Sequence, residues 1–390
     1  MRLLVALTYY HPHWTGLTKV AQRVAEGMAA RGHRVTVLTS RYRPDLAAEE
    51  TLGGVRVIRL PVAGRVSRGM LMPAFPWAAR RLVREHDVVQ IHTPMLEAPL
   101  LAALARRAGA RSVVTHHGDL VMPRRPFDQT VERLVTALLR RALRQADRVV
   151  VYNRDYLEHS AFLAPFAAKC VAIWPPVAVC EPDLAASRRW RSELGLDGHR
   201  LVGFAGRFVE EKGFDFLLAA APLLARELPD VRLVYAGERN VVYERFFERC
   251  RPLLKRAAPY LVDLGLLRDP QRLADFYALC DVFALPSRTD TLALVQVEAM
   301  LCGTPVVVSD IPGARMAVKS AEMGRLVRPR DPAALAEGLR DVLVNRARYL
   351  RPRAEIERRF DARRALDEYE RALTGRDESD ARATPRPARG

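Results

Sequence analysis

Short apolar runs alternate with amphipathic segments along almost all of this 390-residue chain. The alternation is typical of parallel βαβ units, in which helices cover both faces of a sheet. In the first half we expect strands at 2–7, 34–39, 55–60, 87–91, 111–115, 148–152 and 170–173, and helices at 16–31, 75–86, 95–107 and 130–146. In the second half we expect strands at 201–205, 231–236, 261–264, 281–285, 305–308 and 325–327. The predicted class is therefore α/β, with a doubly wound sheet in each half.

The length predicts two domains, because a single hydrophobic core stops growing at roughly 250 to 300 residues. The stretch "WPPVAVCEPD", residues 174–183, cannot form a regular helix because of its prolines. We expect an N-terminal Rossmann-like domain at 1–185, to which a helix at 361–373 returns, and a C-terminal Rossmann-like domain at 186–360. Two such domains predict a central cleft at the carboxyl ends of their strands. The tail 375–390 has no apolar residue beyond Ala and Pro and is expected to be disordered.

The charge is unevenly distributed along the chain. Of 62 basic and 45 acidic residues, 28 and 15 lie in residues 1–190, which leaves 34 and 30 for the rest, so the two parts carry +13 and +4. Such asymmetry indicates an anionic partner, namely a nucleic acid, a membrane surface or an acidic substrate. Because 57 of the 62 cations are Arg, a bias in nucleotide composition explains the excess equally well.

Three further features concern the compartment in which the protein works. The five cysteines are scattered without a CxxC pair or a nearby metal-spaced His, which disfavours a disulfide framework and a zinc site and fits a reducing cytoplasm. The start "MRLLVALTYYHPHW" has too short an apolar run for a signal peptide and is interpreted as a strand. Residues 291–309 contain Glu298, Gly303 and Pro305 and are not expected to cross a membrane.

The stretch "GFAGRFVEEKGFDF" places two cations beside a predicted helix start. Gly203 and Gly206 allow a tight turn, Arg207 follows the strand, and Lys212 precedes Gly213 and a helix expected at 214–227. A helix N-terminus attracts anions, and an Arg fork with a Lys point charge suits a diphosphate. The alternative interpretation is a solvated surface loop.

A second stretch, "ALPSRTDTLALVQVEAMLCGTPVVVSD" at 284–310, offers two carboxylates eight residues apart. We expect Asp290 in the loop after a strand and Glu298 inside the next helix, at different depths of one pocket. The first would meet sugar hydroxyls and the second a ribose diol, while the amides of Thr291, Leu292 and Ala293 would open the helix toward phosphates. If Asp290 were only a helix cap, Glu298 would be an unpaired acid among apolar neighbours, which is costly.

These two motifs, "GR…KG" followed by "PS…D-x7-E-AM-x-x-G-x-PVV", resemble the retaining glycosyltransferases of family 4, the glycogen-synthase-like group with a GT-B fold. The resemblance spans about residues 1–373. It implies transfer of a hexose-type sugar from a nucleotide diphosphate sugar with retained anomeric configuration. It also implies that 1–185 is the acceptor-side domain and 186–360 the nucleotide-sugar-binding domain. It assigns Arg207 and Lys212 to the diphosphate and the leaving group, and Glu298 to the ribose. Asp290 stands where the family most often has Glu, and "TLAL" replaces the commoner "GFGL".

The resemblance also reaches the first domain. In "YYHPHWTGLTKV" the family's Gly-Gly is Thr15-Gly16, and in "VVTHHGDLV" His117 matches the family histidine that faces the donor sugar. Two adjacent histidines at a strand end are otherwise ordinary loop residues. The expected catalytic residues are His117, Arg207, Lys212 and Asp290. The expected donor-binding residues are Gly16, Arg207, Lys212, Gly265, Asp290, Thr291, Leu292, Ala293 and Glu298.

Two segments of the first half bear on the acceptor. The predicted helix 130–146 has an apolar face that includes Leu134 and Leu138, with Arg133 and Arg140 largely opposite, which suits packing on a core or lying on anionic lipid. The segment 64–86 mixes Met, Phe and Trp with Arg. A lipid-linked acceptor or a cell-envelope glycan is therefore expected, with the protein in the cytoplasm and, as a further hypothesis, peripheral on the inner face of the membrane.

Alternative functions remain open at this point. An epimerase or a phosphorylase uses the same scaffold, although a phosphorylase needs a pyridoxal lysine and only five lysines are present. A nucleic-acid-binding protein would explain the charge, but no helix-turn-helix, RRM or zinc-finger pattern is found, so we expect no nucleic-acid partner. No metal is expected, because no Asp-x-Asp follows an apolar strand. No cofactor is expected beyond the nucleotide diphosphate sugar as co-substrate.

Overall fold

The structure is a computed structural model that describes residues 1–66, 69–120, 126–239, 241 and 244–376. It divides into two compact units, Met1–Pro176 with Ala362–Gly390, and Val177–Asp361. The change of unit falls inside the proline-containing stretch 174–183, slightly before the expected boundary. Of the tail expected to be disordered, residues 377–390 lie outside the described residues.

The first unit is built on a sheet whose strands run in the order β10-β9-β8-β7-β1-β2-β4-β3. Its strands are β1 (Arg2–Ala6), β2 (Arg34–Ser40), β3 (Glu49–Leu52), β4 (Val55–Leu60), β7 (Val88–Thr93), β8 (Arg111–His116), β9 (Arg148–Val151) and β10 (Cys170–Ala172). All neighbours pair in parallel except β3 with β4. The order is the Rossmann order, and β7 is buried along its whole length, as expected for a parallel strand covered on both faces.

Three short strands were not predicted from the sequence. The antiparallel edge strand β3 reads "EETL", and a small hairpin joins β5 (Gly64–Val66) to β6 (Gly69–Leu71). The sequences of these three strands contain no continuous apolar run, which is the signal that predicted the other strands.

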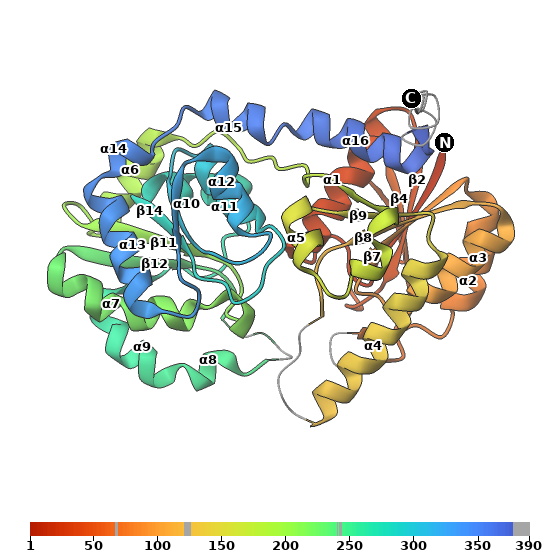
Figure 1. Cartoon of the computed structure of the whole chain (residues 1–390), viewed down its shortest axis with the longest axis horizontal. Helices are drawn as coiled ribbons and strands as arrows, with labels where there is room; N and C mark the ends of the chain where they lie inside the picture. Colours follow the sequence, from red (N-terminus) through yellow and green to blue (C-terminus); the bar gives the residue numbers. More distant parts are fainter. Residues whose placement is uncertain (67–68, 121–125, 240, 242–243, 377–390) are drawn as a thin grey trace, which may run out of the picture. The chain divides into compact units, whose positions relative to one another are not determined.

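Helices cover the first sheet: α1 (Gly16–Ala30), α2 (Phe75–Glu85), α3 (Ala98–Ala108), α4 (Pro126–Gln145), α5 (Arg154–His159) and the C-terminal α16 (Ala362–Thr374). Helix α1 begins at a capping box in which the Thr15 side chain accepts from the amide of Thr18. Helix α16 lies beside α1 (Figure 1), where Arg31 pairs with Asp367 at 2.6 Å and His33 with Glu370 at 2.9 Å. The last helix of the chain therefore packs on the first unit.

The second unit has a six-stranded parallel sheet within the described residues, in the order β13-β12-β11-β14-β15-β16. Its strands are β11 (Arg200–Ala205), β12 (Val231–Ala236), β13 (Leu261–Asp263), β14 (Val282–Leu285), β15 (Val306–Ser309) and β16 (Gly324–Val327). Its helices are α6 (Leu184–Glu193), α7 (Phe214–Glu227), α8 (Phe246–Arg249), α9 (Arg251–Ala257), α10 (Pro270–Leu279), α11 (Leu294–Leu301), α12 (Arg315–Ala321), α13 (Pro332–Val344), α14 (Arg346–Tyr349) and α15 (Arg353–Arg359). This is again the Rossmann order, so the expected α/β class with two Rossmann-like domains is confirmed.

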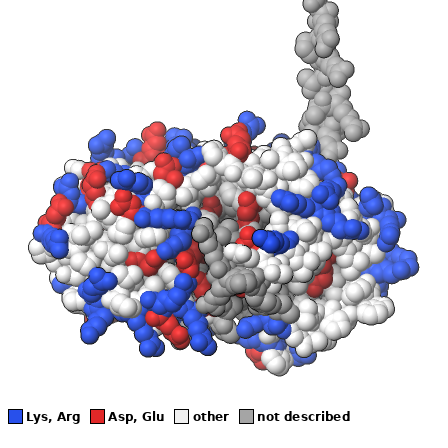
Figure 2. Space-filling model, turned by 60° about the horizontal axis from the view of Figure 1, so that its bottom comes forward, with Lys and Arg blue, Asp and Glu red and all other residues white. Residues whose placement is uncertain are grey.

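Arginines line the exposed faces of two helices of the first unit. Helix α2 exposes Arg80, Arg81 and Arg84 together with Trp77, whose exposed fraction is 74%. Helix α4 packs its apolar face into the core, as the sequence suggested, except that Leu134, next to the exposed Arg133 in the sequence, is 60% exposed. In Figure 2, Lys and Arg side chains gather at the right-hand edge, which belongs to the first unit, with few Asp or Glu beside them.

Candidate active site

The second sheet brings two of the expected loops to one place. Strands β11 and β14 are neighbours at its centre, and the chain leaves β11 for β12 on one side and β14 for β15 on the other. Parallel sheets bind ligands at such a switch point, beyond the carboxyl ends of the strands. Arg207 follows β11, and Asp290 follows β14. Arg207 and Asp290 are 83 positions apart in the sequence, yet both follow strands that end at the edge where a ligand is expected.

A tight turn carries Lys212 toward this edge. A single 3₁₀ turn, Glu210–Lys212, ends at Gly213, whose φ is +68°, and α7 starts directly after it. A Cβ atom on Gly213 would lie 1.9 Å from the carbonyl oxygen of Pro286, the residue that follows β14. Gly213 is therefore needed both for its left-handed conformation and for the close approach of the two loops.

Lys212 and Asp290 form an ion pair. The Lys212 Nζ lies 2.6 Å from Asp290 Oδ2, with side-chain exposed fractions of 23% and 10%, and Ser287 Oγ lies 3.4 Å from the same oxygen. Burial disfavours the ammonium, but the charges of Asp290 and Glu211 outweigh it, so the pKa of Lys212 is raised above its usual value. Lys212 therefore stays charged, and its charge is balanced within the protein.

Arg207 also has a carboxylate partner that the sequence analysis did not identify. Its Nη2 lies 3.4 Å from Glu211 Oε1, and both groups act on the Lys212 ammonium, Glu211 raising and Arg207 lowering its pKa. The expected clamp is thus a cluster of two cations and two carboxylates. Glu211 stands next to Lys212 in "VEEK", which is the only sequence signal that could have indicated it.

Glu298 lies where the sequence placed it, inside a helix, but it is not an unpaired acid. It is 1% exposed on α11, and the Tyr277 hydroxyl of α10 donates to its Oε2 at 2.9 Å. The burial of Glu298 therefore does not by itself require a ligand, because Tyr277 supplies a hydrogen bond to its carboxylate. Nothing in the sequence around Tyr277 indicated this partner.

The other expected donor-binding residues of the second unit flank these loops. Thr291, Leu292 and Ala293 are buried in the loop before α11, and Ala293 is the N-cap, so the helix starts at Leu294 rather than at Thr291 as expected. Gly265 follows β13 with φ +68°, its amide donates to Asp263 Oδ1 at 2.9 Å, and its carbonyl accepts from the Gly237 amide at 2.8 Å.

Gly16 and His117 belong to the first unit, where Gly16 follows the loop after β1 and His117 directly follows β8. Gly16 is the first residue of α1, and a Cβ atom built on it would meet nothing within 4 Å. His117 Nε2 lies 2.7 Å from His92 Nδ1, and its Nδ1 contacts the Tyr152 hydroxyl. One proton must lie between the two imidazoles, so the tautomers of His92 and His117 are linked.

Burial keeps this histidine pair neutral. Burial lowers the pKa of His92 to about 3. Burial, together with the neighbouring His92 and His116, holds the pKa of His117 well below its usual range. His117 therefore acts near neutral pH as a neutral hydrogen-bonding group rather than as an acid.

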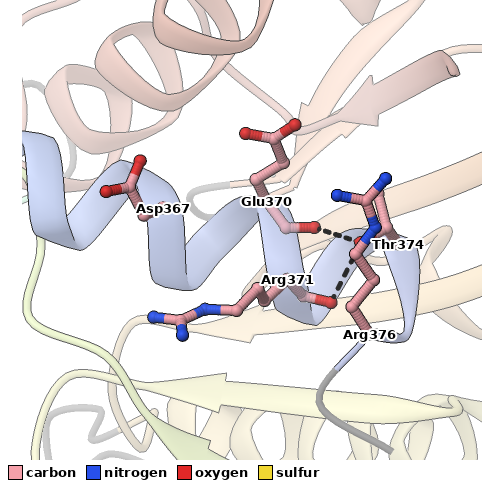
Figure 3. Close-up of a pocket in the computed structure, with 5 residues that line it drawn as sticks. All are labelled: Asp367, Glu370, Arg371, Thr374 and Arg376. Carbon is pink, nitrogen blue, oxygen red and sulfur yellow. Dashed lines mark hydrogen bonds between the residues drawn. The ribbon is translucent and has the colours of Figure 1, made fainter. Parts of the chain in front are cut away.

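A hollow along α16 lies at the opposite edge of the first sheet, beside the starts of β2 and β8. It is lined by Asp367, Glu370, Arg371, Thr374 and Arg376 (Figure 3), and Thr374 Oγ1 donates to the Glu370 carbonyl at 2.8 Å. The carboxylates of Asp367 and Glu370 already pair with Arg31 and His33. The hollow is therefore a by-product of docking α16.

Within the described residues, no three His, Cys, Asp or Glu side chains group so that they could hold a metal ion. In the same part of the chain, no helix combines the length and apolarity needed to span a lipid bilayer.

Known families match both units. Residues 15–176 match the family described as "Glycosyl transferase 4-like domain", and residues 199–345 match "Glycosyl transferases group 1". A GDP-mannose-dependent alpha-(1-6)-phosphatidylinositol monomannoside mannosyltransferase of Mycolicibacterium smegmatis is 30% identical over 337 residues, 82% of this chain and 83% of its own. The phosphatidyl-myo-inositol mannosyltransferase of Mycobacterium tuberculosis is 29% identical over 363 residues, 89% of each chain.

Solved structures show the same fold. Sucrose-phosphate synthase from Thermosynechococcus elongatus superimposes with a TM-score of 0.73 at 20% identity, covering 98% of both chains. HepE from Anabaena, in complex with UDP and glucose, has a TM-score of 0.74 at 20% identity, covering 96% of this chain and 100% of its own. Fold and site together define the GT-B class of nucleotide-sugar transferases. The chain belongs to glycosyltransferase family 4, and it transfers a hexose-type sugar from a nucleotide diphosphate sugar to an acceptor. The epimerase and nucleic-acid alternatives gain no support from these relatives.

Proposed function

We propose that this enzyme transfers mannose from GDP-mannose to a phosphatidylinositol-type glycolipid at an anionic membrane surface. The observation that carries the proposal is the Arg207–Lys212–Asp290 cluster at the switch point of a family 4 chain. The choice of donor and acceptor is supported by the names of the relatives, which are GDP-mannose-dependent and phosphatidylinositol mannosyltransferases.

In the proposed reaction, Arg207 and Lys212 bind the diphosphate and offset the charge that develops on the departing nucleotide. Lys212 must exchange Asp290 for a phosphate oxygen as its partner, which frees Asp290 to accept a hydrogen bond from the donor sugar. Glu298 accepts hydrogen bonds from the ribose diol, and the amides that open α11 face the phosphates. The resemblance assigns the neutral His117 to the donor sugar.

Because two cations already supply the positive charge at the diphosphate, the reaction is proposed to need no metal ion. It is also proposed to need no cofactor besides the donor. Activity in excess EDTA checks the first point, and an activity that returns only with added Mg²⁺ or Mn²⁺ would contradict it.

The acceptor surface is proposed to be α2 and α4. Exposed Trp77 and Leu134 stand beside arginines, which is the composition of a helix face that lies in a lipid interface. Each basic residue near an anionic surface contributes about 1 kcal/mol. We therefore place the enzyme in the cytoplasm, peripheral on the inner face of the membrane.

The test has two steps. A thermal-shift screen of GDP-mannose, UDP-glucose and ADP-glucose identifies the donor, because a ligand that binds the native state raises Tm. Labelled sugar from that donor is then offered to phosphatidylinositol vesicles and, separately, to soluble inositol. Transfer to the vesicles from GDP-mannose supports the proposal. Stabilisation by UDP-glucose alone would refute GDP-mannose as the donor. Equal binding of the enzyme to neutral and anionic vesicles would refute the proposed membrane-facing surface.

A further inference from the structure

Arg288 connects the two loops that carry Lys212 and Asp290, and no role in the site has been assigned to it. Its Nη1 donates to the Glu210 carbonyl at 2.7 Å and to Asp215 Oδ1 at 2.8 Å, and its Nη2 donates to Asp215 Oδ2 at 2.6 Å. The guanidinium carbon lies 4.1 Å from the centroid of the Phe216 ring. Only 16% of the side chain is exposed. These hydrogen bonds and the ring contact together fix the orientation of the Arg288 guanidinium.

The backbone of Arg288 contributes a further connection. Its amide donates to the Glu211 carbonyl at 2.8 Å. Arg288 therefore holds the carbonyl groups of Glu210 and Glu211, the two residues immediately before Lys212. Asp215, which takes the bidentate pair, lies in the first turn of α7, just after Lys212. Arg288 therefore contacts residues that come before Lys212 in the sequence and a residue that comes after it.

Arg288 itself stands two residues before Asp290 in the loop after β14. Apart from the Lys212–Asp290 pair, the loops also approach at Gly213 and Pro286. That backbone contact brings the loops together, but it cannot by itself set how Lys212 is rotated toward Asp290. Three directed side-chain bonds can do so, because a planar guanidinium imposes geometry as well as charge.

We propose that Arg288 is a positioning residue that holds the turn carrying Lys212 beside the loop of Asp290, and that it thereby keeps the Lys212 ammonium where the donor's diphosphate binds. This inference rests on the proposed role of Lys212 at the diphosphate. Lysine at this position keeps the charge but cannot hold Asp215 and the Glu210 carbonyl with one planar group. Glutamine keeps a donor but loses the charge and the fork.

The fold should survive the loss of Arg288. Asp215 would lose its cation, but it lies at the N-terminus of α7, where the helix dipole stabilises a negative charge. The matched control is Arg249 of α8, whose half-exposed side chain pairs with the Glu210 carboxylate at 2.5 Å. Arg249→Gln therefore removes a cation that contacts the same turn but leaves the contacts of its backbone carbonyls in place.

The first experiment measures GDP affinity by calorimetry for Arg288→Gln, Arg288→Lys, Asp215→Asn and Arg249→Gln, on the native background and with Lys212→Gln. We expect Arg288→Gln and Asp215→Asn to weaken GDP about tenfold, Arg288→Lys to lie between them and the parent, and Arg249→Gln to change it less than twofold. On the Lys212→Gln background, Arg288→Gln should change the GDP affinity less than twofold, because the lysine that Arg288 positions is absent. An equal effect on both backgrounds would overturn the proposal, as would unchanged affinity in Arg288→Gln.

A second readout needs no nucleotide. With only five lysines in the chain, the Cε signal of Lys212 can be assigned in lysine-labelled protein by its loss in Lys212→Gln. Arg288→Gln should move this signal toward those of exposed lysines, whereas Arg249→Gln should not. If the parent binds no nucleoside diphosphate, the proposed function fails while this readout still decides the positioning role. An unmoved Lys212 signal in Arg288→Gln would overturn that role independently.

Discussion

Lys212 Nζ and Asp290 Oδ2 lie 2.6 Å apart, and this pair joins the loop after β11 to the loop after β14. A diphosphate that binds Lys212 must compete with Asp290. We therefore expect Asp290→Asn to bind free GDP roughly fivefold more tightly, on the order of the 1 kcal/mol that one partly exposed charge pair contributes. Transfer from the sugar nucleotide should be lost, because the sugar loses its carboxylate. Calorimetry with GDP and an activity assay check both parts, and weaker GDP binding would contradict the competition.

Removing either cation should abolish transfer, but the two variants should differ in stability. Lys212→Ala leaves the nearly buried Asp290 without its cation, and breaking a buried pair costs about 3 to 5 kcal/mol, which its partial exposure reduces to at most about 3. Arg207→Ala breaks a longer and more exposed contact with Glu211, so its cost should stay near the 0 to 1 kcal/mol of a surface pair. Urea unfolding measures the difference. Activity within tenfold of the parent in both variants would remove the clamp from the mechanism.

Gly213→Ala should disrupt the turn that carries Lys212. The added Cβ would lie 1.9 Å from the Pro286 carbonyl oxygen, so the backbone must move. Gly303→Ala is the matched control, because Gly303 also has a positive φ of +83° but open space around its Cβ. The control should lose only the roughly 1 kcal/mol of a left-handed alanine. Equal Tm values for the two variants would show that the close approach is unimportant.

Variants of Glu298 and Tyr277 should separate an effect on nucleotide affinity from an effect on the free energy of unfolding. Glu298→Gln should weaken GDP and GDP-mannose alike by roughly 1.5 to 3 kcal/mol, the contribution of a hydrogen bond to a charged group, because ribose is common to both ligands. Tyr277→Phe removes a donor from a buried carboxylate and should lower the free energy of unfolding by a similar amount. Calorimetry and urea unfolding on both variants are the measurements. Unchanged GDP binding in Glu298→Gln would exclude the ribose role.

Acid should destabilise the first unit through its neutral histidine pair. The pKa of His92 is lowered to about 3, whereas an unfolded His titrates near 6.5. Between these values the unfolded chain binds a proton that the folded protein does not, so stability falls as the pH drops, by up to about 1.4 kcal/mol per pH unit. His92→Asn should reduce this slope between pH 6.5 and 5. An unchanged slope would place the acid sensitivity elsewhere.

The sheets and the main motifs could be predicted from the sequence because they depend on local pattern. Buried parallel strands such as β14 and β15 contain continuous apolar runs, and the left-handed turn at Gly213 lies directly before the helix that it starts. Strand β3 could not be predicted from its own residues, because it is mostly polar and joins the sheet by pairing with β4. The late start of α11, after a buried loop, likewise had no local signal.

The partners of the site residues were decided only by the tertiary structure. Sequence alone indicated Arg207, Lys212, Asp290 and Glu298, because charged residues at strand and helix ends form a recognisable pattern. It could not indicate that Lys212 pairs with Asp290, that Tyr277 donates to Glu298, or that Arg288 holds the Lys212 turn. These contacts join residues 21 to 78 positions apart. Their distances depend on which strands are neighbours in the sheet, and strand order is set by the packing of the whole unit rather than by any local run of residues.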